Sequence, residues 1–202
     1  MEQINILVQH GLSNSEAATK GSKRLDLEPQ ALMVSDAEEM SSIIRQNLSA
    51  FDECGSVLAA TYRRTERLWE TYLGPGCAFF IVKEPKSGHI LGGAGLGPLA
   101  GLPHTEGYGE IRDLVVNQDS RSLGLGRKLL EKCILAAKSF DYSCIYLKTT
   151  PKMEQARKLF EIHGFKAVRH SNDSEKGLSI KIPCYYLLTL KAPAKDLLDP
   201  YE

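Results

Sequence analysis

The chain has 202 residues, of which 43% are hydrophobic and 25% charged, which fits one soluble globular domain with a short extension. Its 25 basic and 25 acidic residues cancel, and this balance argues against nucleic acid or an anionic membrane surface as the main partner. There is no membrane-spanning apolar run and no secretory signal, and the five scattered cysteines predict no metal site, so we expect a cytoplasmic protein.

Changes in composition divide the chain into three segments. Residues 1–28 are polar and weakly periodic, so we expect an N-terminal extension there. The globular domain is expected over residues 29–191, and residues 192–202 are expected to form a C-terminal tail.

The first half of the domain is predicted to contain two helices and four strands. Ser35 or Asp36 can N-cap a first helix, in which Met40, Ile43, Ile44 and Leu48 recur at helical spacing. A second helix is expected over residues 55–72, where Gly74-Pro75-Gly76 ends it. The strands are expected over residues 31–34, 77–82, 90–96 and 108–116.

The second half is predicted to contain two helices and three strands. The first helix is amphipathic, and its apolar face consists of Leu125, Leu129, Leu130, Cys133, Ile134 and Ala137. The second helix is opened by Pro151 and ended by Gly164, and its inner face consists of Ala156, Leu159, Phe160 and His163. The strands are expected over residues 144–147, 165–168 and 182–190. The whole domain is therefore read as α/β, with about seven strands and four helices.

The segment Arg121-Ser122-Leu123-Gly124-Leu125-Gly126 lies between a predicted strand and the amphipathic helix. A helix N-terminus presents unpartnered backbone N–H groups that favour phosphate, and glycine lets a phosphate approach the backbone. Residues 121–158 hold nine basic and three acidic side chains, an excess that either a polyanionic ligand or solvated helix surfaces would explain. A dinucleotide fingerprint would need glycine in place of Leu129, and a Walker loop would need GK[ST], so neither fits.

Three motifs follow one another in order: Glu110–Val116 in a strand, Arg121–Gly126 in the turn, and Ala156–Phe165 in the last helix and its GF ending. In this order they resemble the fourth strand, the [QR]xxGx[GA] pyrophosphate loop and the closing helix of the GNAT superfamily of acetyl-CoA-dependent N-acetyltransferases. The resemblance covers residues 30–191. It implies the GNAT fold, a mixed and mostly antiparallel seven-stranded sheet that is flanked by about four helices and splayed at its central strands.

The resemblance also implies acetyl-CoA as cosubstrate and no metal. In this family the pantetheine arm lies along the backbone of the strand that matches Leu114–Val116, and backbone amides of the loop hold the pyrophosphate. The cofactor-binding residues expected on this basis are Leu114, Val115, Val116, Arg121, Ser122, Leu123, Gly124, Leu125, Gly126 and Arg127. Val115 and Val116 equally suit an ordinary strand core.

Glu110 matches the glutamate that acts as general base in part of the family. An ammonium ion has no lone pair, so a base must remove its proton before the amine attacks a thioester. The alternative is that Glu110 is an ordinary charge at a strand end. Backbone amides near Val115 would polarise the thioester carbonyl.

Two positions depart from the family's pattern. Phe160 stands where many members have a tyrosine that protonates the departing thiolate, and Met153 stands where many have an asparagine. The proton could come from water or from Tyr146, Tyr185 or Tyr186. Alternatively no acid is needed, because a thiol with a pKa of about 8.5 leaves tolerably as thiolate. The general acid therefore stays unassigned.

Several weaker candidates are left open. His104 and Glu106 could face the acceptor or be solvated in their loop, and His163 is expected to be a hydrogen-bonded core residue. Trp69 and Tyr72 are expected to be packing residues. Four loop acids either hint at a cationic acceptor or are simply solvated; they are Asp52, Glu53, Asp173 and Glu175.

The resulting hypothesis is an N-acetyltransferase that moves an acetyl group from acetyl-CoA to a primary amine of a small molecule or peptide by direct, base-assisted attack. The cysteines show no pairing with histidine that would support a covalent enzyme intermediate. One alternative is a catalytically silent acyl-CoA-binding or regulatory module, which Phe160 favours, and another is a different kind of nucleotide-binding protein. Neither nucleic acid nor a membrane is expected as partner, and homodimer formation is left open.

Overall fold

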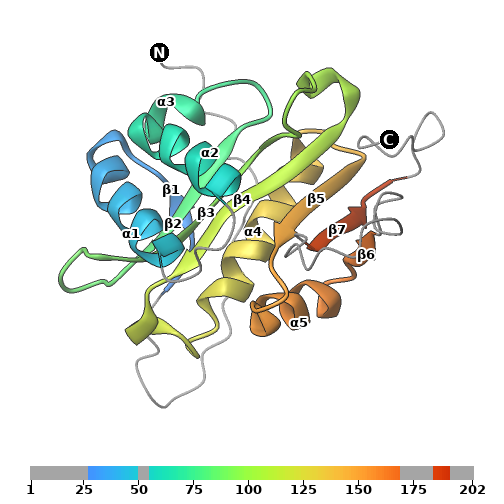
Figure 1. Ribbon diagram of the computed structural model, residues 1–202. Coiled ribbons are helices and arrows are strands. Elements are labelled where there is room, and N and C mark those ends of the chain that lie inside the picture. Colours follow the sequence, from blue (N-terminus) through green and yellow to red (C-terminus); the bar gives the residue numbers. More distant parts are fainter. Residues whose placement is uncertain (1–26, 50–54, 169–183, 192–202) are drawn as a thin grey trace, which may run out of the picture.

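Seven strands form one mixed sheet in the computed structural model, which describes residues 27–49, 55–168 and 184–191. The strands are β1 (Gln30–Ala31), β2 (Ala78–Lys83), β3 (Ile90–Pro98), β4 (Tyr108–Val116), β5 (Cys144–Thr149), β6 (Lys166–Val168) and β7 (Cys184–Thr189). Their order is β1-β2-β3-β4-β5-β7-β6, and all neighbouring pairs are antiparallel except β4 and β5, which are parallel (Figure 1). The predicted seven-stranded, mostly antiparallel sheet is confirmed.

Some sequence predictions fall on parts of the chain outside these ranges. They are the N-terminal extension up to residue 26, the C-terminal tail at 192–202, and the loop acids Asp52, Glu53, Asp173 and Glu175.

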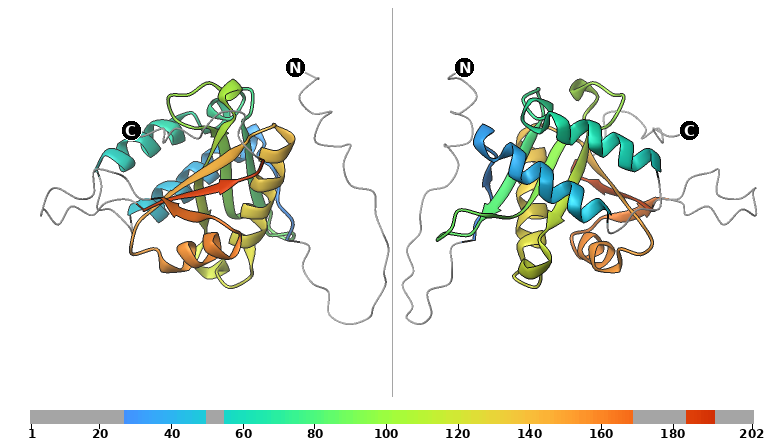
Figure 2. Two further views of the ribbon diagram at one scale, coloured as in Figure 1. Left: turned by 90° about the vertical axis from the view of Figure 1, so that its right-hand side faces the viewer. Right: turned by 60° about the vertical axis from the view of Figure 1, so that its left-hand side comes forward.

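Five α-helices cover the two faces of the sheet. They are α1 (Ala37–Ser49), α2 (Gly55–Glu66), α3 (Leu68–Thr71), α4 (Leu125–Ser139) and α5 (Glu154–Ile162). Figure 2 shows α1, α2 and α3 on the face opposite α4, and α5 contributes Phe160 to the same core as α4. Three short 3-10 helices complete the described elements: η1 (Val34–Asp36), η2 (His104–Glu106) and η3 (Gln118–Ser120). None of the helices in the described ranges is long and apolar enough to cross a membrane.

The prediction of one helix over 55–72 was wrong, because Arg67 interrupts it. Arg67 has φ −136° and ψ 52°, which no helix contains, and it separates α2 from α3. The break lets Leu68 and Tyr72 enter the core beneath α1, where both are buried. Burying these two side chains outweighs the lost helical continuity, since each is worth about 1.5–3 kcal/mol.

Two other predicted boundaries were wrong. The strand expected at 31–34 ends at Ala31, and η1 follows, where the Asp36 carboxylate accepts a hydrogen bond of 3.3 Å from the Met33 N–H. Pro151 does not open a helix, because the Met153 N–H bonds to the carbonyl of Thr150 in a turn and α5 begins only at Glu154.

Two apolar cores lie on opposite faces of the sheet. The core under α4 contains the predicted helix face: Leu125, Leu129, Leu130, Cys133 and Ala137 are buried, and Ile134 packs against them. The core under α1 and α3 contains Met40, Ile44, Leu68, Phe79 and Ile81. The sheet is therefore covered on both faces, and its strands read as apolar runs.

The sheet splays between its only described parallel pair of strands. β4 pairs with β5 from Tyr108 to Ile111, opposite Cys144 to Leu147. Beyond that point β4 continues to Val116 without pairing to β5, and Figure 1 shows the two strands diverging. The predicted splay at the central strands is confirmed.

Candidate active site

β4 contains a bulge at Asp113. Gly93 of β3 pairs with Val115 and Gly95 pairs with Arg112, so β4 has one residue more than β3 between these two pairs. Asp113 has a φ of 54°, in the left-handed region that aspartate adopts more readily than most residues. Because of the extra residue, Arg112 and Asp113 both turn toward the face that α2 and α3 cover.

After the bulge the alternation of side chains resumes. Leu114 and Val116 pack in the core under α4, and Val115 packs in the core under α1. The side chains of these three predicted cofactor-binding residues are thus used in packing. Toward the diverging β5, this part of β4 presents main-chain groups that are not paired with that strand.

Glu110 lies on β4 just before the two strands separate, and its side chain is only 15% exposed. Burial raises the pKa of Glu110 above its ordinary value, and the nearby positive charge of Arg112 opposes this rise. Arg112 Nε lies 3.3 Å from Glu110 Oε2, at an angle that makes no hydrogen bond, and Arg112 Nη2 donates to the Pro98 carbonyl at 2.7 Å. A carboxylate whose pKa is raised is a stronger base than an ordinary glutamate, which suits it to accept a proton.

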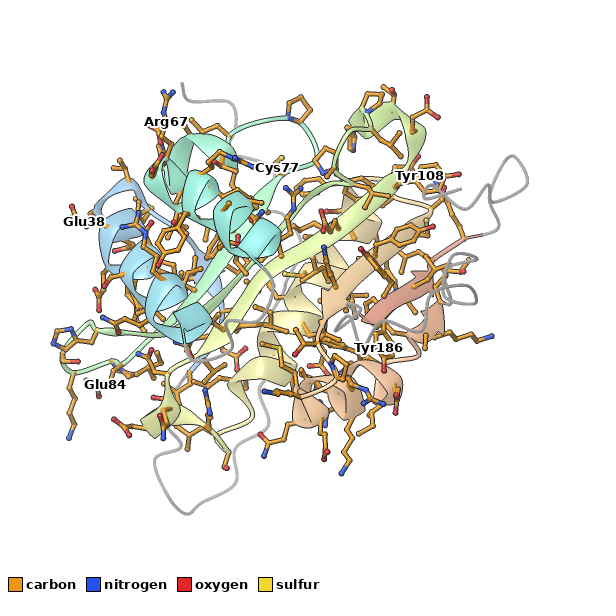
Figure 3. The ribbon with its side chains drawn as sticks, viewed as in Figure 1. Glu38, Arg67, Cys77, Glu84, Tyr108 and Tyr186 are labelled. Carbon is orange, nitrogen blue, oxygen red and sulfur yellow. The ribbon has the colours of Figure 1, made fainter. Side chains whose placement is uncertain are left out.

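Other side chains lie at the same end of the sheet as Glu110. Tyr146 is its register partner on β5, and the rings of Tyr146 and Tyr108 are 6.4 Å apart. Cys77 is half-buried near Arg112, and burial raises the pKa of its thiol although Arg112 opposes the rise. Figure 3 shows Cys77 and Tyr108 at the same end of the sheet, where β2 and β4 begin.

The sequence did not reveal the charged network next to this site. Arg64 of α2 contacts Asp113 through two hydrogen bonds, Nη2 to Oδ1 at 2.8 Å and Nε to Oδ2 at 3.2 Å. The hydroxyl of Tyr72 donates to Asp113 Oδ2 at 3.1 Å, so Tyr72 is more than the packing residue that was expected. Burial raises the pKa of Tyr72 well above its ordinary value, and the Asp113 carboxylate adds to the rise. Burial disfavours the charge on Arg64, but the hydrogen bond to Asp113 and the attraction of its negative charge together outweigh burial and raise the Arg64 pKa.

The glycine-containing loop leads from β4 into α4. Arg121, Ser122, Leu123 and Gly124 are exposed, and Ser122 and Gly124 have φ values of 71° and 75°. A Cβ added at Gly124 would meet nothing within 4 Å, so the space beside this turn is open. The first main-chain bond of α4 runs from Lys128 N–H to the Gly124 carbonyl, which leaves the N–H groups of residues 125–127 without an intrahelical acceptor.

Two arginine side chains flank this loop. Arg121 Nη2 donates to Asn47 Oδ1 of α1 at 3.4 Å. Arg127 Nε donates to Glu131 Oε1 at 2.8 Å, one turn further along α4. In the described structure both arginines thus have a protein partner, and each guanidinium has further N–H donors beside the main-chain N–H groups of the loop.

Other residues considered from the sequence have structural partners. His104 Nε2 lies 2.9 Å from the Phe140 carbonyl, and its ring stands edge-on to Tyr142. His163 is hydrogen-bonded to the Leu159 carbonyl at 2.8 Å and lies 3.3 Å from Glu131, which confirms the expected core histidine.

Phe160 is buried, and its ring packs against the rings of Phe165 and Tyr186. The Tyr186 hydroxyl donates to Glu161 Oε1 at 3.0 Å and accepts from Arg157 Nε at 3.2 Å. Figure 3 shows Tyr186 beside α5. Within the described residues, no group of three or more His, Cys, Asp or Glu side chains could hold a metal ion.

Residues 44–165 match the acetyltransferase (GNAT) family. The uncharacterized N-acetyltransferase YjgM of Escherichia coli (strain K12) is 27% identical over 106 residues, which are 52% of this chain and 61% of that protein. The chain thus spans about three fifths of the length of this curated relative.

Solved structures share the fold. An N-acetyltransferase from Staphylococcus aureus Mu50 is 21% identical with a TM-score of 0.65, covering 82% of this chain and 99% of that one. A GCN5-related N-acetyltransferase from Kribbella flavida is 19% identical with a TM-score of 0.65, covering 81% and 98%. The putative acetyltransferase yncA from Salmonella typhimurium, solved with its cofactor acetyl-CoA, is 17% identical with a TM-score of 0.61, covering 83% and 97%.

The family match spans more than half of the chain. It includes the bulged strand β4, the glycine loop and all of α5. The chain therefore belongs to the acetyltransferase (GNAT) family.

Proposed function

We propose that this protein transfers an acetyl group from acetyl-CoA to a primary amine by direct attack, with Glu110 as general base. The main support is the place of Glu110: a largely buried carboxylate whose pKa is raised by burial, at the point where β4 leaves β5. Membership of the family, the N-acetyltransferase name of the curated relative and the acetyl-CoA in one related structure support the same reaction.

The residues present fit acetyl-CoA. The diphosphate would rest on main-chain N–H groups of residues 122–127, where the space beside Gly124 is open and the helix N-terminus favours negative charge. The pantetheine arm would follow the main chain of Leu114–Val116, which is not paired with β5. Because the side chains of these strand residues are packed in the two cores, binding would depend on backbone geometry more than on residue type.

Glu110 would take a proton from the ammonium group of the acceptor, directly or through water, and so expose the nitrogen lone pair. The nitrogen then bonds to the thioester carbonyl carbon and loses its second proton to solvent, the carbon–sulfur bond breaks, and the sulfur leaves as a thiolate that takes a proton from solvent. A main-chain N–H of β4 beyond the bulge would stabilise the negative charge that develops on the carbonyl oxygen. Tyr186 is an unsuitable acid for the thiolate, because its hydroxyl already bonds to Glu161.

The test is the release of free thiol from acetyl-CoA in the presence of a panel of primary amines, with and without Glu110→Gln. We expect release that depends on the amine, and a loss of roughly 10²- to 10⁴-fold in the variant at neutral pH. Glu38→Gln is the matched control, because Glu38 is an exposed carboxylate at the outer side of α1 (Figure 3). Binding of acetyl-CoA without amine-dependent release would favour a silent acyl-CoA-binding module instead.

A further inference from the structure

We propose that Arg64 and Tyr72 are positioning residues that hold Asp113 and thereby fix the bulge of β4, so that a main-chain N–H beyond it meets the acyl carbonyl of the thioester. The inference rests on the proposed function. It adds to that function one residue of α2 and the residue that follows α3, neither of which touches a reacting atom.

The network grips Asp113 from two sides. Arg64 binds both carboxylate oxygens, and its Nη2 also donates to Thr61 Oγ1 at 2.9 Å, which fixes the guanidinium on α2. Tyr72, which directly follows α3, reaches Oδ2 by crossing over β3 at Gly95, where a Cβ would lie only 2.2 Å from the Tyr72 hydroxyl. The side chain of Asp113 is 3% exposed, so the carboxylate is held by protein groups on both oxygens and is shielded from water.

Stability alone is a weak reason for such a network. Taking a carboxylate and a guanidinium out of water costs several kcal/mol per ion, and well-packed apolar residues often serve equally well. The backbone of Asp113 is also in the left-handed region, a conformation that persists in non-glycine residues when the surroundings enforce it. Arg64 and Tyr72 are the described groups that make hydrogen bonds to the carboxylate of this residue.

Because of the position of the bulge, the network acts on the part of β4 that would bind the acyl group. Asp113 immediately precedes Leu114–Val116, the stretch of β4 that leaves β5. A peptide plane that follows a residue of fixed φ and ψ has a fixed direction, so holding Asp113 sets where the next main-chain N–H groups point. Releasing Asp113 should therefore weaken the contact to the acyl carbonyl, while leaving the diphosphate site around Gly124 unchanged.

The experiment compares two ligands that differ at the carbonyl. Acetyl-CoA has the thioester carbonyl, and S-ethyl-CoA has a methylene in its place. Calorimetry on the full chain gives the preference, the Kd of S-ethyl-CoA divided by that of acetyl-CoA. In Asp113→Asn and Tyr72→Phe we expect this preference to fall roughly two- to tenfold, which corresponds to the loss of one hydrogen bond. The Kd of S-ethyl-CoA should stay unchanged. In the acetyl-transfer assay, kcat should fall while the KM for the acceptor stays constant.

Asp113→Asn is informative because asparagine also adopts the left-handed conformation, so the variant removes the charge and keeps the backbone preference. Two controls remove similar groups elsewhere. Asp36→Asn removes a buried carboxylate that pairs with Lys83 at 2.7 Å, and Tyr142→Phe removes a buried hydroxyl that donates to the Gly76 carbonyl at 2.9 Å. Both should lose stability and keep the wild-type preference.

The outcomes are distinct. An unchanged preference in folded Asp113→Asn and Tyr72→Phe overturns the positioning role, and so does an equal loss in the two controls. If Asp113→Asn does not fold, the milder Tyr72→Phe decides. A wild-type protein that binds neither ligand refutes the proposed function itself, and the positioning role falls with it. A wild-type protein that acetylates amines while the variants keep its preference refutes only the positioning role.

Discussion

The carboxylate of Glu110 and the guanidinium of Arg112 lie on the same face of β4, with Oε2 and Nε 3.3 Å apart. Two opposing influences meet at this pair. Burial raises the pKa of Glu110, and the positive charge of Arg112 lowers it. Their balance sets the pH above which Glu110 is ionised and able to accept a proton, which makes the pair accessible to pH-rate measurements.

Replacing Arg112 with Met should raise the pKa of Glu110, because the variant removes the nearest cation and leaves the burial. Since a general base works in its ionised form, the acidic limb of the kcat/KM profile should move to higher pH. Arg112→Lys keeps the charge and should leave the limb closer to that of the wild type. If the acidic limb of the kcat/KM profile of Arg112→Met is unchanged or moves to lower pH, Glu110 is not the titrating group.

Glu110→Gln should cost activity and increase stability. Because burial raises the pKa of Glu110 in the folded state, the folded protein binds this proton more tightly than the unfolded chain does. The stabilisation that comes with the bound proton is complete below the ordinary pKa of 4.5 and is lost as the pH rises through the raised pKa. The glutamine cannot ionise, so the variant escapes this loss.

Urea denaturation at several pH values checks this stability effect. The free energy of unfolding of Glu110→Gln relative to wild type should increase with pH above about 4.5 and then level off. Glu38→Gln, on the exposed face of α1, should show no such trend. A relative stability of Glu110→Gln that falls with rising pH would mean that the folded state favours the ionised carboxylate.

Alanine substitutions at the two loop glycines should distinguish effects on stability from effects on ligand binding. Gly124 has a φ of 75°, so Gly124→Ala should destabilise the fold by about 1–2 kcal/mol. Gly126 lies inside α4, and an alanine Cβ there would make only ordinary contacts, 3.7 Å from Leu159 and 3.9 Å from Val116. Gly126→Ala should therefore be neutral or stabilising by about 0.5–1 kcal/mol.

Gly126→Ala should nevertheless weaken CoA binding if the diphosphate approaches the main chain of this turn. Losing one hydrogen bond to a charged group corresponds to roughly a ten- to hundredfold rise in Kd. Thermal unfolding and calorimetry on the same preparation measure both effects. A Gly126→Ala protein with wild-type affinity for CoA would place the diphosphate elsewhere.

Tyr186→Phe tests a tyrosine that the sequence offered as a proton donor. Its hydroxyl bonds to Glu161 and Arg157, so we assign it to the packing of β7 on α5. The variant should lose about 1 kcal/mol of stability and keep kcat within about twofold, with the basic limb of the pH-rate profile unchanged. A tenfold drop in kcat would restore Tyr186 as a candidate acid.

The order of elements and their apolar faces could be predicted from the sequence because they depend on local patterns. The strand at 108–116 and the buried face of α4 were both predicted correctly, since each follows a regular period. The break at Arg67 could not be predicted this way. It results from a tertiary preference for burying Leu68 and Tyr72, which no local signal near Arg67 marks.

The site was predictable only in part for a similar reason. Glu110 and the glycine loop belong to contiguous motifs, whereas Arg64 contacts Asp113 across 49 positions of the chain. Arg112-Asp113 reads as an ordinary pair of strand charges, and only the register between β3 and β4 shows that one residue is extra. A cluster built from α2, α3 and a bulge becomes visible only when the tertiary structure is known.

The bulge has a consequence for how this strand would tolerate a deletion. If Asp113 were deleted, β4 could pair continuously with β3, and Leu114, Val115 and Val116 would keep the faces on which they now pack. Arg64 would be left with an unmatched charge, and the Tyr72 hydroxyl would lose its acceptor. The extra residue is thus dispensable for both hydrophobic layers, and what it adds is a buried carboxylate just before β4 leaves β5.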